Sequence, residues 1–246
     1  MITVEEAERI DREFTDAFEM EDASRRQAAE KLYGAWQELY ALMGRENNNS
    51  DKLGSDILDW QIGNWANDVT IALHNAGLYK ECIEVNKQIL KISWSHNRDL
   101  FYENARRDIA DEYGDSGDIQ MCYRLYEEYL NDDPLWGWGW IGYFRQLNDH
   151  DDLRYEQVLD ELYEKVRSGV EFRDKEDLYR ELGDEYNALG NQERADFFYG
   201  MEDNEKEIRQ KNLFANIASK SKTERAIEKI TYRSQSFPEE AFQVIT

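Results

Sequence analysis

The sequence predicts an all-α protein built from antiparallel helix hairpins. Only two prolines occur in 246 residues, Pro134 and Pro238, so long helices are permitted almost everywhere. Strand signals are almost absent, because no β-branched run alternates with polar residues and no Asn-Gly turn occurs. Apolar residues recur at helical spacing in nearly every window. Within 118–130, for example, they are Ile119, Cys122, Tyr123, Tyr126, Tyr129 and Leu130.

Breaks in this spacing delimit the helices along the chain. Ten main helices are expected, at 4–19, 22–44, 54–76, 79–92, 98–114, 118–131, 135–147, 152–168, 174–188 and 191–210. Two short helices are expected near 222–231 and 238–244. Because most of the connections are short, consecutive helices should lie antiparallel to each other.

Capping residues and glycines mark the ends of several of these helices. A hydroxyl three residues before a glutamate forms a capping box at Thr3/Glu6, Ser221/Glu224 and Ser236/Glu239. Gly77, Gly117 and Gly190 each end a helical stretch, since glycine adopts the left-handed conformation without a steric penalty. The Asn-rich stretch 46–54 forms a longer loop.

Two segments of the chain resemble each other when Gly117 is aligned with Gly190. The alignment pairs Ala110 with Gly183, Tyr113 with Tyr186, Cys122 with Ala195 and Tyr126 with Tyr199. Around Gly77, Leu73 falls on the tyrosines and Cys82 on the small residue. Small residues let paired helices approach closely, and aromatic residues fill the space between one pair and the next.

This pattern resembles the tetratricopeptide repeat, a helix–turn–helix unit of about 34 residues. The resemblance covers roughly 55–205 and implies a right-handed solenoid of helix hairpins, clearest at 98–134 and 174–205. The repeats are irregular, because Gly77 and Gly117 lie 40 residues apart and the 135–168 hairpin lacks the glycine turn. We therefore expect a repeat domain over 1–210 and a short helical extension over 211–246.

A second resemblance lies in Asp133-Pro-Leu-Trp-Gly-Trp-Gly-Trp-Ile-Gly142 and in the stretch 173–186. These segments are similar to uncharacterised bacterial repeat proteins, common in Firmicutes, many of which carry a terminal cysteine-rich zinc motif like the one that ends SecA. No cysteine follows Cys122 in this chain, so the resemblance implies no zinc here.

The charge of the chain limits its partners. The formal net charge is −23, and residues 201–246 are neutral with eight basic and eight acidic residues. A bare nucleic acid or an anionic membrane would repel the acidic first 200 residues, so neither is an expected partner. The sequence shows no secretory pattern and no long apolar run, and its two cysteines do not form a disulfide framework. These features favour a cytoplasmic location.

The stretch Gly137-Trp-Gly-Trp-Ile-Gly142 matches the dinucleotide-binding pattern G-x-G-x-x-G. That pattern needs a strand before it, whereas Asn-Asp-Asp-Pro precedes it here, so nucleotide binding is not favoured. The preferred interpretation is a helix capped by Asp132 or Asp133, with tryptophans around its first turn and Trp138 facing a groove.

No residues indicate catalysis, a cofactor or a metal. The three histidines, at 74, 96 and 150, have no partner histidine three or four residues away. The acidic stretch 149–152 lacks the calcium-loop pattern and is interpreted as a solvated turn with an N-capping aspartate. Cys82 and Cys122 occupy the small slot of their repeats and are expected to be buried spacers. The chain is therefore not expected to be an enzyme.

In the tetratricopeptide family the first helix of each hairpin lines a concave peptide-binding groove. The residues that the resemblance places there are Asn64, Asn67, Ile71, His74, Asn104, Arg107, Asp111, Trp138, Ile141, Arg145, Asp177, Arg180, Asp184 and Asn187. Arg107, Arg145 and Arg180 would form a basic stripe suited to carboxylates, and asparagines can hold an extended backbone. Alternatively, Arg107–Asp111 and Arg180–Asp184 are i,i+4 pairs that serve only their helices.

The expected function is that of a non-enzymatic, regulatory scaffold that binds a protein or peptide in this groove. The alternative is an inhibitor of the phage or mobile-element type, whose 45 acidic residues in the first 200 imitate nucleic-acid phosphates and block a nucleic-acid-binding protein. The acidity could also serve only solubility.

Overall fold

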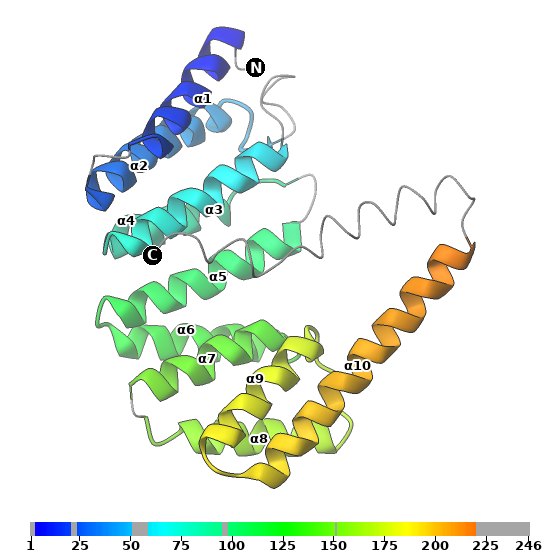
Figure 1. Cartoon of the computed structure of the whole chain (residues 1–246). Coiled ribbons are helices and arrows are strands. Elements are labelled where there is room, and N and C mark those ends of the chain that lie inside the picture. Colours follow the sequence, from blue (N-terminus) through cyan, green and yellow to red (C-terminus); the bar gives the residue numbers. More distant parts are fainter. Residues whose placement is uncertain (1–2, 21–23, 51–58, 95–97, 151, 220–246) are drawn as a thin grey trace. The chain divides into compact units, whose positions relative to one another are not determined.

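A computed structural model describes residues 3–20, 24–50, 59–94, 98–150 and 152–219 (Figure 1). Within these ranges the chain forms ten helices and no strand, which confirms the all-α prediction for this part of the chain. The helices are α1 Val4–Phe18, α2 Arg25–Gly44, α3 Asp59–Asn75, α4 Tyr79–Ile89, α5 Arg98–Asp115, α6 Ile119–Asp132, α7 Gly137–Asp149, α8 Tyr155–Arg167, α9 Lys175–Ala188 and α10 Gln192–Ser219. None of these helices is both long enough and apolar enough to cross a bilayer.

Helices α1 to α9 end within three residues of their expected positions, but α10 is longer than expected. It continues to Ser219 rather than ending near residue 210. One pair four residues apart crosses the expected end of the helix, with Lys211 Nζ 3.2 Å from Glu207 Oε2. The helices expected at 222–231 and 238–244, and their two capping boxes, lie outside the described residues.

The local signals at helix ends are largely confirmed. Thr3 and Glu6 form the expected reciprocal capping box at α1. The three turn glycines, Gly77, Gly117 and Gly190, have φ values of +68°, +91° and +75°.

Two expected aspartate caps are wrong. Helix α7 begins after Trp136 with no side-chain cap, because Asp132 and Asp133 end α6 instead. Helix α8 begins after Arg154 and likewise has no side-chain cap. Asp152 accepts a hydrogen bond from the Arg154 N–H at 2.9 Å, which stabilises the turn just before that helix.

The structure divides into two compact units, Met1–Arg173 (unit 1) and the chain from Asp174 onward (unit 2). In unit 1 each helix from α1 to α7 packs against the next one in the chain (Figure 1). Helix α2 also contacts α4, and α5 also contacts α7. In unit 2, α9 packs against α10.

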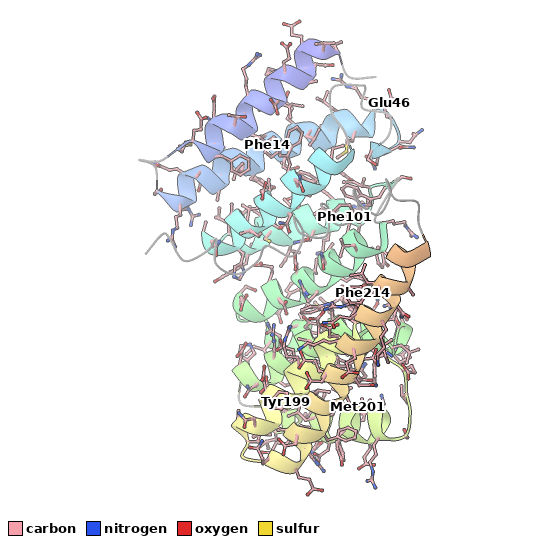
Figure 2. The ribbon with its side chains drawn as sticks, turned by 45° about the vertical axis from the view of Figure 1, so that its right-hand side comes forward. Phe14, Glu46, Phe101, Tyr199, Met201 and Phe214 are labelled. Carbon is pink, nitrogen blue, oxygen red and sulfur yellow. The ribbon has the colours of Figure 1, made fainter. Side chains whose placement is uncertain are left out.

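Aromatic side chains join neighbouring hairpins in unit 1. Phe14 of α1 stacks on Trp65 of α3, with ring centroids 4.6 Å apart (Phe14 is labelled in Figure 2). The fully buried Trp36 of α2 donates its indole N–H to Gln88 Oε1 of α4 at 2.7 Å. These contacts cross from the first hairpin to the second, so the two hairpins share one core.

Close packing explains the glycines of the G-x-G-x-x-G stretch. A Cβ on Gly139 would lie 2.2 Å from Trp136 Cε3, and one on Gly142 would lie 2.2 Å from the Tyr126 hydroxyl. Both aromatic side chains are fully buried, so neither can move aside. The glycines therefore let α7 approach the Trp136 and Tyr126 rings.

The two clearest repeats carry the same hydrogen bond at the same positions. Tyr126 donates its hydroxyl to Asp111 Oδ1 at 2.5 Å, and Tyr199 (labelled in Figure 2) donates to Asp184 Oδ1 at 2.8 Å. In each repeat the aspartate lies six residues before the turn glycine and the tyrosine nine residues after it. The sequence alignment of the repeats thus corresponds to a matching local geometry in each unit.

The small positions of the repeats are buried, as expected. Cys82 is 1% exposed, and Cys122 and Ala195 have no exposed surface. The missing Cβ of Gly183 would lie 2.6 Å from Tyr199 Cε1, so glycine there allows α9 and α10 to approach closely.

Candidate functional site

Helices α3, α5 and α7 of unit 1 line a continuous surface depression, the α3–α5–α7 hollow. It consists of three adjoining depressions of about 560, 460 and 190 Å³, all of which include Asn104 and Asp108 of α5. Each of these helices is the first member of its hairpin, which is where the sequence comparison places the groove.

Most of the residues expected in the groove line this hollow. They are Asn64, Asn67, Ile71, His74, Asn104, Arg107, Asp111, Trp138, Ile141 and Arg145. The remaining four expected residues lie on α9, which belongs to unit 2 and not to the unit that contains the hollow. They are Asp177, Arg180, Asp184 and Asn187.

Several lining residues escaped the sequence comparison, and four of them are acidic. They include Leu100, Asp108, Glu112, Asp115, Gln146 and Asp149. Four of these six lie on α5, at the i, i+8, i+12 and i+15 positions counted from Leu100. Their helical spacing was visible in the sequence, but 53 carboxylates in the chain gave no reason to single them out.

The arginines are not paired as the i,i+4 interpretation expects. The Arg107 guanidinium lies 5.3 Å from the centroid of the Trp138 ring, and its Nη2 atom is 3.9 Å from Asp108 Oδ1. Arg180 Nη2 is 3.1 Å from Asp177 Oδ1 and 3.4 Å from Glu181 Oε1. Trp138 is the one partly exposed tryptophan among Trp136, Trp138 and Trp140, and its ring contacts the Arg107 guanidinium.

Asp111 links the hollow to the core of unit 1. Its Oδ1 atom accepts hydrogen bonds from the Tyr126 hydroxyl at 2.5 Å and from Gln146 Nε2 at 3.1 Å. Burial raises the pKa of Asp111 to about 7, although the Tyr126 hydrogen bond and the Arg107 charge act in the opposite direction. Near neutral pH this carboxyl group therefore exists in both its protonated and its charged form.

We expect Asp111→Asn to stabilise the protein at alkaline pH. The folded state holds a proton on Asp111 that the unfolded chain loses between about pH 4 and pH 7, so wild-type stability falls as the pH rises through that range. Asparagine keeps the acceptor oxygen and carries no charge. Urea unfolding should show a gain of about 1–2 kcal/mol at about pH 8 that shrinks toward pH 5. An equal difference at both pH values would contradict this assignment.

His74 and Glu112 form the second polar contact of the hollow. His74 Nδ1 lies 2.9 Å from Glu112 Oε1 and 3.7 Å from Asp115 Oδ2. Glu112 is only 4% exposed, and burial raises its pKa while the His74 contact lowers it. Burial likewise raises the pKa of Asp108, so the carboxylates on this face of α5 are poorly solvated.

The two cysteines of unit 1 are unreactive. Burial raises the pKa of Cys82 far above its ordinary value and that of Cys122 to about 12, so neither thiol is an activated nucleophile. In the described part of the chain, no three histidine, cysteine, aspartate or glutamate side chains are grouped to hold a metal ion.

Comparisons with protein-family models, with curated proteins and with solved structures found no match to this chain.

Proposed function

We propose that this protein is a non-enzymatic scaffold that binds a protein or peptide in the α3–α5–α7 hollow. We also propose that its hairpins form an irregular, right-handed solenoid of the tetratricopeptide type. Two observations support the solenoid: the additional α2–α4 and α5–α7 contacts within unit 1, and the Tyr–Asp hydrogen bond shared by two repeats.

The observation that carries the binding function is the clustering of the expected groove residues in one hollow. Its asparagine side chains, Asn64, Asn67 and Asn104, have no hydrogen-bond partner among the described residues, so each can donate to and accept from an extended backbone. Two apolar side chains on the same surface, Ile71 and Leu100, are 51% and 55% exposed. Exposed apolar groups beside unpaired amides are typical of a peptide-binding surface.

The binding function can be tested by selecting displayed random peptides against the full chain and measuring the affinity of the selected peptides. Because two backbone hydrogen bonds are removed, Asn67→Ala combined with Asn104→Ala should weaken binding about tenfold or more. The matched control is Asn75→Ala combined with Asn131→Ala, which removes two exposed amides from the same unit outside the hollow. Equal losses in the two double variants, or a selection that yields no peptide, would count against the hollow.

A further inference from the structure

We propose that the α3–α5–α7 hollow recognises a basic segment of its partner, with a lysine or arginine side chain seated among the carboxylates of α5 and α7. This inference rests on the proposed peptide-binding function and adds the charge of the peptide to it. It reverses the expectation of a basic stripe that binds carboxylates.

The charge of the lining supports a cationic ligand. Two arginines, Arg107 and Arg145, line the hollow. The carboxylates that line it are Asp108, Asp111, Glu112, Asp115 and Asp149. Arg107 lies beside Asp108 and the Trp138 ring, and the five carboxylates outnumber the arginines even when both arginines are counted in full. The excess of carboxylates attracts cations and repels acidic peptides.

The supply of hydrogen-bond donors leads to the same conclusion. Glu112 Oε1 accepts from His74, but its buried Oε2 atom has no donor among the described residues. The exposed side chain of Asp149 has no partner there either. Asp111 uses one oxygen for both of its hydrogen bonds. A ligand that fits this surface therefore brings N–H groups, and a charged ammonium or guanidinium forms the strongest bonds to carboxylates.

The orientation of the Gln146 amide is fixed by the same network. Gln146 is 7% exposed and donates its Nε2 to Asp111 Oδ1 at 3.1 Å. The opposite orientation would place its carbonyl oxygen against the Asp111 carboxylate. Its Oε1 atom therefore faces the buried Gly114 and has no donor among the described residues.

Apolar surface next to the carboxylates favours a peptide over a small inorganic cation. Ile71 and Leu100 are half exposed and line the same hollow as Asp108. The methylene stem of a lysine or arginine can pack on such side chains while its charged end reaches the carboxylates. The described residues also offer no grouping suited to a bound metal ion.

The charge preference can be tested with three sets of short labelled peptides. All sets share the same leucine positions, and the remaining positions carry lysine and arginine, glutamine, or glutamate. Fluorescence anisotropy with the full chain at about 0.15 M salt should show the basic set binding at least about tenfold more tightly than the neutral set, and the acidic set not binding. Asp108→Asn combined with Asp149→Asn should reduce the affinity for the basic set about tenfold.

The matched control is Asp11→Asn combined with Glu128→Gln, which removes two exposed charges of unit 1 outside the hollow. This control should change the affinity less than about twofold. If both double variants lost the same affinity for the basic peptides, the proposal would be overturned. Binding would then depend on charge spread over the whole surface, as in a nucleic-acid mimic. Preferred binding of neutral or acidic peptides that depends on Asn104 would overturn the charge preference but leave the binding function intact. If no set binds, both proposals are wrong.

Discussion

Gly142→Ala is expected to destabilise unit 1 by about 2–4 kcal/mol, a large loss for the addition of one methyl group. The added Cβ would lie 2.2 Å from the Tyr126 hydroxyl and 2.7 Å from its Cζ atom. Tyr126 has no exposed surface, and its hydroxyl donates to Asp111, so the ring cannot turn away without breaking that hydrogen bond. The substitution therefore combines steric overlap with the loss of a buried polar contact.

The measurement is urea unfolding monitored by circular dichroism, with Gly34→Ala as the matched control. Gly34 lies within α2, and a Cβ there would have no neighbour within 4 Å. Alanine is the better helix former, so this control should gain about 0.5–1 kcal/mol. If the two variants show the same change in stability, the close contact between α7 and Tyr126 is not present in solution.

Trp36→Ala is expected to cost about 3–5 kcal/mol, because it removes the largest fully buried side chain between the first and second hairpins. The substitution leaves a cavity between α2 and α4 and removes the strongest donor to Gln88 Oε1, at 2.7 Å. Gln37 Nε2, at 3.3 Å from the same oxygen, compensates for only part of this loss. Amide hydrogen exchange should show the loss of protection concentrated in α2 and α4.

Trp36→Phe separates the two contributions. Phenylalanine keeps most of the apolar volume but cannot donate a hydrogen bond, so we expect a smaller cost of about 1–3 kcal/mol. A similar cost for the two variants would show that the hydrogen bond dominates. If neither variant changed the protection of α2 and α4, the link between the two hairpins would be refuted.

Much of the fold could be predicted because its determinants are local. Helical spacing, the capping box at Thr3 and the turn glycines act within a few residues, and the helix bounds follow from them. The end of α10 was not predicted, because the helix continues past the expected end near residue 210, where the exposed Lys211–Glu207 pair replaces the apolar spacing. The caps of α7 and α8 were predicted wrongly, because Asp133 follows the end of α6 and Asp152 accepts from the Arg154 N–H in the turn before α8.

The candidate site was only partly predictable, because its character depends on contacts between helices. The alignment of repeats identified the lining positions Asn104, Arg107 and Trp138. It could not show that Trp138 and Asp108 both engage Arg107, since that contact joins α5 to α7. The net negative charge of this surface therefore depends on which side chains α3, α5 and α7 bring together, and the sequence does not show this.

The protonation of Asp111 has a practical consequence for calorimetry. A positively charged ligand bound beside Asp111 would lower the pKa of this carboxyl group, so Asp111 would release its proton to the solvent near neutral pH. The heat recorded for such an association would then include the ionisation heat of whichever buffer accepts that proton. Titrations in phosphate and in Tris would disagree in enthalpy, and their difference would count the protons released.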